Sequence, residues 1–232
     1  MRIRLFFSAA VILFFAAMPV IGADEAVDGP SAALLNPSAA TAVAPAEFTV
    51  KVETTAGDFT IKVHRDWAPI GADRFFNLVS MGYYDDTAFY RVILTPRPFM
   101  AQMGFNGDPA VNAVWRTARM KDDPVKKSNT RGMVTFATGG PNTRTTQFFI
   151  NYVDNSRLDG MGFSPFGEVI EGMSVVKKFY GGYGEGAPQG KGPSQARIAA
   201  EGNDYLKKEF PKLDYIIKAE IVAEVGAEVP AS

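Results

Sequence analysis

Three polar side chains stand among apolar ones on expected strands, and they are the first candidates for chemistry. Arg91, Gln102 and Gln147 lie in the segments AFYRVI, FMAQMG and QFFINY, where a residue two positions away is Phe or Met. Residues two apart share one face of a strand. Each polar residue alone fits a solvated outer face better than a site. Together they indicate a pocket with apolar walls and a few hydrogen-bonding groups, which is typical of a ligand site.

Such a pocket would hold a fixed cation and amide groups, but no nucleophile or pair of carboxylates. The chain has no Cys and a single His, so neither a Cys–His pair nor a zinc site built from these ligands is expected. A Ser–His–Asp triad would need His64, which lies in the alternating pattern FTIKVHR and is interpreted as an ordinary strand-end residue. We therefore expect no metal and no cofactor. The pocket is suited to stabilising a charge distribution rather than to making or breaking bonds.

Length and composition are typical of a globular protein with a neutral body. The 232 residues are 47% hydrophobic and 21% charged, with a formal net charge of -1. Two bases lie in residues 1–23 and three acids in residues 24–46, so the rest of the 24 bases and 25 acids balance. Binding to nucleic acid depends on clustered Lys and Arg. We therefore expect no nucleic-acid partner.

The first residues are typical of a secretory signal peptide. Arg2 and Arg4 precede an apolar stretch, which is followed by Pro19 and small residues. We expect cleavage after Gly22 or Ala23, and an uncleaved membrane anchor is the alternative. The mature protein would then be exported to a periplasm or secreted, with no membrane attachment after cleavage, and we expect a monomer.

The remaining chain divides into a linker, one domain and a tail. Residues 24–46 are rich in Ala, Pro and Ser without a sustained period and predict a disordered linker. Residues 47–223 predict the folded domain, and residues 224–232 a flexible tail.

The domain pattern predicts a mainly β fold. Alternating apolar residues in EFTVKVE and DFTIKVH, joined by TTAG, predict a hairpin. Pro69 suits a first helical turn, and the apolar spacing that follows predicts a helix ended by Gly82. A second helix is expected over 172–180, and the polar stretch 195–210 could add a short one. Seven or eight strands around one core indicate an antiparallel barrel, because closure removes exposed edges. Further strands are expected at 88–93, 99–104, 133–137, 147–152, 166–169 and 213–222.

Five segments of this domain resemble the cyclophilin-type peptidyl-prolyl cis–trans isomerases in order and spacing. They are AFYRVI, PFMAQMGFNGDP, GGPNTRTTQFFIN, RLDG and FGEVIEGM, and the resemblance extends from about Phe48 to Val222. It implies a closed eight-stranded antiparallel β-barrel capped by two α-helices. It also implies an isomerase (EC 5.2.1.8) that accelerates rotation about X–Pro bonds, here in exported proteins during folding, with proline-containing segments of unfolded or partly folded proteins as partners.

Two other functional classes remain open at this point. One is a binding module or chaperone that recognises proline segments without accelerating their rotation. The other is a barrel that binds a small molecule, which does not explain the GGPNTRTTQFFIN block. Arg91 separates the first alternative from the enzyme, because a pure binder needs no cation against the proline nitrogen.

The resemblance also assigns roles to individual residues. Arg91 is similar to the family's catalytic arginine, and Gln102 to the glutamine beside it. Phe163 lies roughly where many members have a histidine. The positions that resemble the walls around the proline ring are Phe99, Met100, Phe149 and Leu158, and those that resemble the groove for the preceding residue are Ala137 and Gln147. Thr138 is a further substrate-binding candidate, at the position of the extended-peptide contact.

Four features depart from the family pattern. The segment between Arg91 and Phe99 is three residues longer than the common spacing, which changes a loop at the pocket rim. Thr138 and its neighbour Gly139 replace the usual Asn-Ala. Arg157 stands where many eukaryotic members carry a tryptophan that contacts cyclosporin. The stretch 181–212 is longer than in the minimal domain, and the sequence assigns it no role.

Overall fold

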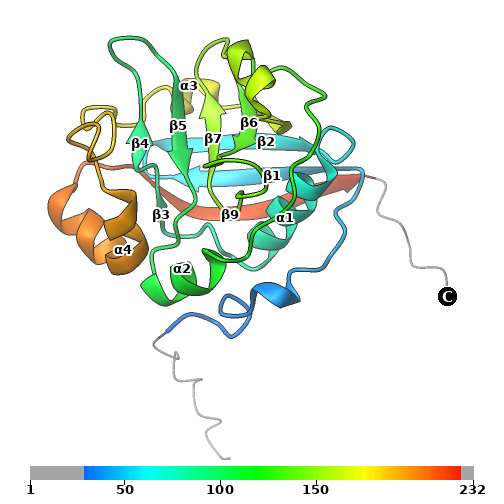
Figure 1. The fold of residues 1–232 in the computed structure, drawn as a ribbon, viewed down its shortest axis with the longest axis horizontal. Helices are drawn as coiled ribbons and strands as arrows, with labels where there is room; N and C mark the ends of the chain where they lie inside the picture. Colours follow the sequence, from blue (N-terminus) through cyan, green and yellow to red (C-terminus); the bar gives the residue numbers. More distant parts are fainter. Residues whose placement is uncertain (1–28, 226–232) are drawn as a thin grey trace, which may run out of the picture.

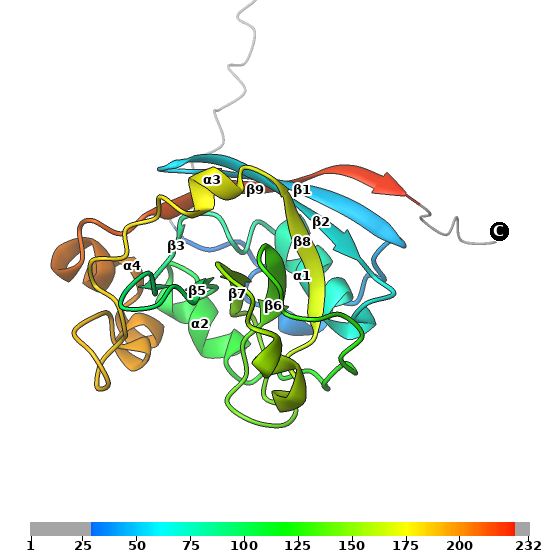
Figure 2. The same cartoon turned by 90° about the horizontal axis from the view of Figure 1, so that it is seen from above.

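A computed structural model describes residues 29–225, and these form a nine-stranded antiparallel sheet that curls around one core (Figure 1). The strands follow the hydrogen-bonded order β3-β9-β1-β2-β8-β6-β7-β5-β4. Figure 2 shows β1, β2 and β9 together on one side, with β5, β6 and β7 facing them across the core. The strand bounds are β1 Glu47–Thr54, β2 Gly57–His64, β3 Thr87–Ala88, β4 Arg91–Val92, β5 Met100–Met103, β6 Met133–Phe136, β7 Phe148–Asn151, β8 Pro165–Glu171 and β9 Tyr215–Val225.

The expected eight-stranded closed barrel needs correction in one detail. The strand predicted over 88–93 is broken into β3 and β4, so the count is nine. The break arises because the chain changes partners there: Phe89 N donates to Asp214 O beside β9, whereas Ile93 N donates to Met100 O of β5. No ladder joins β3 to β4 within residues 29–225, and the two ends of the sheet are connected by the chain itself. The antiparallel, mainly β class is confirmed.

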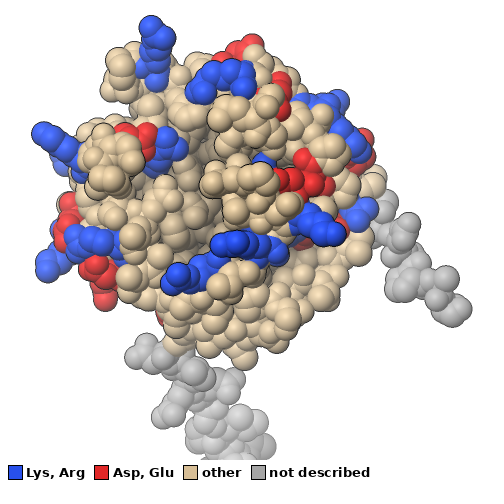
Figure 3. Space-filling view, viewed as in Figure 1, with Lys and Arg blue, Asp and Glu red and all other residues tan. Residues whose placement is uncertain are grey.

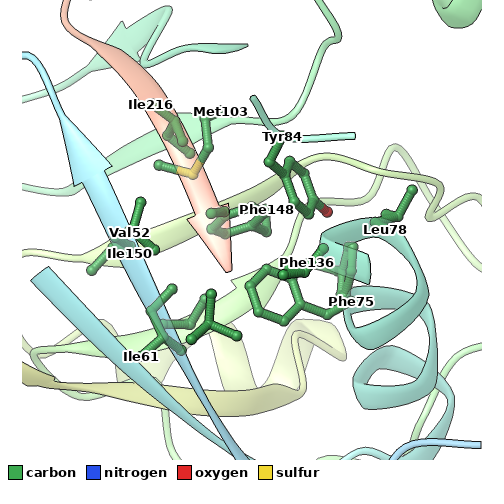
Figure 4. Packing of buried hydrophobic residues seen from close by; sticks show 14 of the residues in the cluster. Val52, Ile61, Phe75, Leu78, Tyr84, Met103, Phe136, Phe148, Ile150 and Ile216 are labelled. Carbon is green, nitrogen blue, oxygen red and sulfur yellow. The ribbon is translucent and has the colours of Figure 1, made fainter. Parts of the chain in front are cut away.

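The predicted hairpin supplies one wall of the core. Strands β1 and β2 pair in the register Val50↔Ile61, with Thr54 opposite Gly57 at the turn. Gly57 has a φ of 123°, a conformation that glycine adopts without strain. Alternate residues of β1 are buried, as a half-buried strand requires. Figure 4 shows this wall meeting aromatic side chains from the opposite strands and from a helix.

Helix α1 (Pro69–Ser80) confirms the first helix prediction, and Gly82 follows it with a φ of 70°. Its buried face includes Phe75 and Leu78, which are 1% and 0% exposed. Burying each such side chain contributes about 1.5–3 kcal/mol, so this face fixes the helix on the sheet.

The other helices differ from expectation. The segment 172–180 forms only the four-residue α3 (Met173–Val176). Helix α2 (Pro109–Trp115) was not predicted, and the polar stretch 195–210 forms the longer α4 (Gln195–Glu209), which has non-helical backbone at Gly202. Thus the described residues contain four α-helices where two were expected.

Part of the predicted linker is folded onto the domain. Trp115 Nε1 donates to Leu34 O at 2.8 Å, and Ala44 N donates to an oxygen of Asp73 at 2.9 Å. Ala44 is buried, and Leu34 packs against the main core. The prediction of a disordered linker is therefore wrong for residues 34–46, because these backbone groups find fixed partners on α1 and α2.

The predicted termini are only partly described. The expected signal peptide, residues 1–23, lies outside the described residues, as do residues 24–28 and 226–232. Glu224 and Val225, which were assigned to the tail, belong to β9. Between residues 29 and 225, no helix has the length and apolar character needed to cross a bilayer.

The stretch 181–212 packs against the barrel beside β3. Its apolar residues Ile198, Tyr205, Leu206 and Phe210 form a second cluster with Ala88, Tyr90 and Leu213. In Figure 1, α4 lies at the edge of the molecule that carries β3 and β4. This stretch is therefore a folded extension of the domain.

Candidate active site

One cavity of about 490 Å³ brings together all the site residues predicted from the sequence. In Figure 3, the face viewed is hollowed near its centre, and the surface there is formed mainly by uncharged residues. The predicted residues that line the cavity are Arg91, Phe99, Met100, Gln102, Ala137, Thr138, Gln147, Phe149, Leu158 and Phe163. This placement shows that they share one site, whereas their individual roles stay predictions.

The apolar half of the cavity is a small cluster of side chains from different elements. Met100 projects from β5, Phe149 from β7 and Leu158 from the 3-10 helix η2 (Ser156–Met161), and they are 1–4% exposed. The ring of Phe163 meets that of Phe149 edge-on, with 5.7 Å between centroids. Phe99 and Ala137 complete the cluster. This half can enclose a compact apolar group such as a five-membered ring.

A buried polar network holds η2 in place, and with it the wall residue Leu158. Asn129 is fully buried, and its Nδ2 donates to an oxygen of Asp159 and to Phe163 O, both at 2.8 Å. Thr135 Oγ1 donates to Asn129 Oδ1 at 2.8 Å. Although burial alone would raise it, the hydrogen bonds from Ser128 and Asn129 lower the pKa of Asp159. The carboxylate therefore serves as a charged acceptor that ties η2 to the segment before β6.

The polar half begins with a cross-strand pair. Arg91 on β4 lies opposite Gln102 on β5, and Arg91 Nη1 donates to Gln102 Oε1 at 2.9 Å. Gln102 Nε2 in turn donates to Gln147 Oε1 at 3.2 Å, and Tyr90 OH donates to the same oxygen at 2.5 Å. Burial raises the pKa of Tyr90 well above its ordinary value, so its hydroxyl stays a neutral donor. The side chains of Arg91, Gln102 and Gln147 thus form one chain of hydrogen bonds along the cavity.

Glu185 is a partner of Arg91 that the sequence interpretation missed. Arg91 Nε donates to Glu185 Oε1 at 2.6 Å, and Arg91 Nη2 donates to Glu185 Oε2 at 2.7 Å. The hydrogen bonds from Arg91 hold the pKa of Glu185 below its usual value, so this carboxylate is ionised at neutral pH. The available signal was a lone acid in the loop GGYGEGAPQGKG, in a stretch without an assigned role.

Other cavity residues belong to the loop before β7. Thr143 and Thr145 line the cavity and lie within the GGPNTRTTQFFIN segment, but they were not singled out. Thr138 Oγ1 hydrogen-bonds with Thr143 Oγ1 at 3.0 Å and donates to Gly140 O. The hydroxyl that replaces the usual asparagine therefore organises this loop. Gln195, at the start of α4, also lines the cavity.

His64 lies outside the cavity, as an ordinary residue of a strand end. It stacks on Trp67 with 4.0 Å between ring centroids, and its Nδ1 lies 2.9 Å from a carboxylate oxygen of Glu47. Over the described part of the chain, no three His, Asp or Glu side chains are placed to hold a metal ion. Among the described residues that line the cavity, Arg91 is the one charged side chain.

Comparisons with known proteins place this chain in a family. The family model described as "Cyclophilin type peptidyl-prolyl cis-trans isomerase/CLD" matches residues 49–200. The chain is 32% identical over 189 residues to peptidyl-prolyl cis-trans isomerase B of Escherichia coli, a match that covers 75% of this chain and 99% of the relative. It is 35% identical over 136 residues to an Arabidopsis thaliana peptidyl-prolyl cis-trans isomerase, covering 55% of this chain and 79% of the relative.

Solved structures match the fold. A cyclophilin type isomerase of Cryptosporidium parvum is 21% identical, with a TM-score of 0.56, and the match covers 77% of this chain and 99% of that one. A second structure of that protein, determined in the presence of the dipeptide Ala-Pro, gives a TM-score of 0.53 at the same identity, over 76% of this chain and 99% of that one.

Proposed function

The chain belongs to the cyclophilin-type peptidyl-prolyl cis–trans isomerases, and we propose that it performs this reaction in the cavity beside Arg91, on X–Pro segments of exported proteins during folding. Family membership makes it an enzyme of the class EC 5.2.1.8. The observation that carries the proposal for the site is that Arg91 lines an otherwise largely uncharged cavity with its guanidinium oriented by partners on two sides.

The reaction requires a transition state that a fixed cation can stabilise. Rotation about an X–Pro bond crosses a barrier of about 18–20 kcal/mol because it breaks amide resonance. In the twisted state, the proline nitrogen regains a lone pair and accepts a hydrogen bond better than in the planar amide. A guanidinium aimed at this nitrogen binds the transition state more strongly than either ground state, which is the condition for catalysis. Arg91 supplies that donor through its planar guanidinium.

The two halves of the cavity have different roles in the proposed reaction. Met100, Phe149 and Leu158 enclose the proline ring while the acyl side turns, and Gln102 holds the Arg91 guanidinium. Ala137 and Gln147 line the groove for the residue before proline, Thr138 contacts the extended peptide, and Phe99 and Phe163 complete the apolar wall. An acceleration of about 10⁵-fold needs roughly 7 kcal/mol of differential stabilisation. One charged donor together with orientation of the ring is sufficient for that magnitude, with no cofactor.

We also propose, from the sequence of residues 1–23, that the protein is exported. A basic start, an apolar stretch and small residues are typical of a cleaved signal peptide. The substrates would then be proline-containing segments of proteins that fold in the periplasm or outside the cell, and the enzyme would act as a monomer. Cell fractionation tests this: the protein should appear in the exported fraction, shortened by about 23 residues.

The activity itself is tested with a short X–Pro peptide. Proline-limited isomerisation, which takes tens to hundreds of seconds uncatalysed, should be accelerated by the protein at micromolar or lower concentration. A catalytically silent protein that still binds the peptide would overturn the proposal and leave the proline-binding module. If the protein also fails to bind the peptide, the cavity is neither the site of an isomerase nor that of a proline-binding module.

A further inference from the structure

We propose that Glu185 is a positioning residue for Arg91, and that the extension at 181–212 serves to deliver this carboxylate to the guanidinium. This inference rests on the proposed role of Arg91. It assigns a function to a stretch of the chain that the sequence left without one, and to a residue outside the segments that resemble the family.

Arg91 and Glu185 form a bidentate ion pair. Arg91 donates from Nε and Nη2 to the two oxygens of Glu185, at 2.6 and 2.7 Å, while Nη1 donates to Gln102. A bidentate pair of this kind fixes the plane of the guanidinium as well as its position. Arginine has five N–H donors, so one hydrogen on Nη1 and one on Nη2 remain for a substrate.

Glu185 holds the guanidinium without occupying the cavity. Arg91 and Gln102 are among the residues that line the cavity, whereas Glu185 is not. Glu185 therefore binds the guanidinium of Arg91 without itself forming part of the cavity wall.

The loop that carries Glu185 is built tightly around it. Gly186 N donates to Glu185 Oε1 at 3.0 Å, and Gly192 N donates to Glu185 O at 2.8 Å. A Cβ at Gly190 would lie 2.2 Å from Glu185 O, closer than any side chain tolerates. These glycines thus permit the chain to close around Glu185 and orient its side chain.

The extension is held together by its own contacts on both sides of this loop, and Asn203 attaches it to the rest of the domain. Before the loop's turn, the ring of Tyr183 meets that of Phe210 edge-on at 5.0 Å between centroids. After it, Ser194 N donates to Tyr205 OH at 3.0 Å, and Asn203 Nδ2 donates to Asp86 O at 2.7 Å. Glu185 is therefore placed by a folded element, and its distance from Arg91 does not depend on a free loop.

Two opposing effects follow from this pair, and orientation is the larger one. A carboxylate reduces the positive field at the proline nitrogen, but the side chains of Arg91 and Glu185 are 23% and 41% exposed, so water screens much of that field. The geometric constraint is not screened. Without Glu185, the guanidinium keeps Gln102 as its one side-chain hydrogen-bond acceptor among the described residues, and it samples orientations that do not face the substrate.

The test compares Glu185→Gln with a matched control, Glu201→Gln, in the same extension. Glu201 also pairs with an arginine, Arg197, but on the exposed surface of α4. Glutamine keeps the size of glutamate and one acceptor oxygen. It loses the negative charge and the second oxygen that accepts a hydrogen bond from Arg91. We expect kcat for an X–Pro peptide to fall about five- to tenfold in Glu185→Gln, with KM unchanged and with the control at the wild-type rate.

A double variant separates positioning from a general structural role. In an Arg91→Ala background, Glu185→Gln should have no further effect on kcat, because the carboxylate acts only through the guanidinium. A wild-type or higher kcat in Glu185→Gln, with Arg91→Ala inactive, would overturn the positioning role and leave the proposed function intact. An additive loss in the double variant would also overturn it. If Arg91→Ala keeps full activity, the proposed role of Arg91 fails, and the inference fails with it.

Discussion

The two halves of the cavity are held in place by different means. Met100, Phe149 and Leu158 in the apolar half are 1–4% exposed and are fixed by burial against one another. The polar half contains Arg91, whose side chain is 23% exposed and is fixed by hydrogen bonds, including those to Glu185, 94 residues away in the sequence. The apolar half is thus fixed by the packing of the fold itself. The polar half is fixed by hydrogen bonds between side chains that the fold brings together.

This difference has an energetic consequence. Removing a buried apolar side chain loses its transfer free energy and leaves a space, so it lowers stability. Removing a partly exposed charged side chain loses little stability, because an exposed ion pair contributes only about 0–1 kcal/mol. Substitutions in the apolar half should therefore weaken folding and substrate binding together. Substitutions in the polar half should reduce the rate and leave folding intact.

Arg91→Ala is expected to have the largest effect. Isomerase activity should fall at least about a hundredfold, equivalent to about 2.7 kcal/mol of lost transition-state stabilisation. Arg91→Lys should also be severely impaired, because a point charge cannot donate to the proline nitrogen while holding Gln102 and Glu185. Peptide binding should fall much less than turnover in both variants. The measurements are the isomerisation rate and the thermal melting of each protein.

These variants also test whether the two halves are independent. A folded Arg91→Ala protein with a near-wild-type rate would contradict the electrostatic account and place the chemistry elsewhere in the cavity. A large drop in melting temperature would show that the polar half contributes to the fold after all.

Leu158→Ala tests the apolar half. We expect a loss of about 2–3 kcal/mol in the free energy of unfolding, because the side chain is 3% exposed and its removal leaves a space beside Phe149 and Met100. KM for the peptide should rise about tenfold, which corresponds to about 1.4 kcal/mol, while kcat changes little. Denaturant unfolding and steady-state kinetics measure the two effects.

Met161→Ala is the matched control for this prediction. Met161 lies on the same 3-10 helix but is 64% exposed. Its replacement should leave stability and KM close to wild type. A Leu158→Ala protein whose kcat falls with an unchanged KM would mean that the apolar wall acts on the transition state rather than on binding.

The same difference explains how much of the site could be predicted from the sequence. The apolar walls and the pair of Arg91 and Gln102 lie on strands, where a period of two and the order of segments determine which side chains meet. Glu185 could not be predicted, because glycine-rich loops carry no period and its partner is distant in the chain. The break between β3 and β4 was missed for a related reason: the change of partner at Phe89 depends on β9, at the far end of the domain.

The structure of the segments outside the barrel could not be predicted for a similar reason. Residues 34–46 have the composition of a linker, yet Asp73 and Trp115 supply partners for their backbone groups. Helix α4 has a polar sequence, and its buried face forms where its apolar side chains join a cluster with Ala88 and Tyr90. In both cases, the structure depends on a surface that exists only after the barrel has formed.

Asp159→Asn tests the network behind the apolar wall, with a smaller expected effect. The carboxylate accepts hydrogen bonds from Ser128 Oγ, Asn129 N and Asn129 Nδ2. Because Asp159 is partly exposed, we expect a loss of about 1 kcal/mol at neutral pH. The folded-state pKa of Asp159 is lowered, so its stabilisation is present above its unfolded pKa of about 4 and disappears as pH falls through the folded value. The advantage of the wild type should therefore shrink below about pH 4, as measured by unfolding at several pH values. A difference independent of pH would contradict a charged role.

Arg157→Trp is expected to have the smallest effect, and it tests the rim where the two halves meet. The ring of Phe99 has the guanidinium of Arg157 4.9 Å from its centroid and that of Arg91 at 6.0 Å, so the rim carries two cations around one ring. Arg157 stands where many cyclophilins carry a tryptophan that contacts cyclosporin, and it offers neither the indole donor nor the flat apolar surface. We therefore expect weak binding of cyclosporin by the wild type.

Arg157→Trp should tighten this binding about fivefold, which corresponds to about 1 kcal/mol, a typical value for an added aromatic contact. Arg157→Ala is the control: it removes the cation without adding the ring, and it should not reproduce the gain. Isothermal titration measures the three affinities. Nanomolar binding by the wild type would contradict this prediction, and equal gains in both variants would mean that the cation itself, rather than the missing ring, weakens binding.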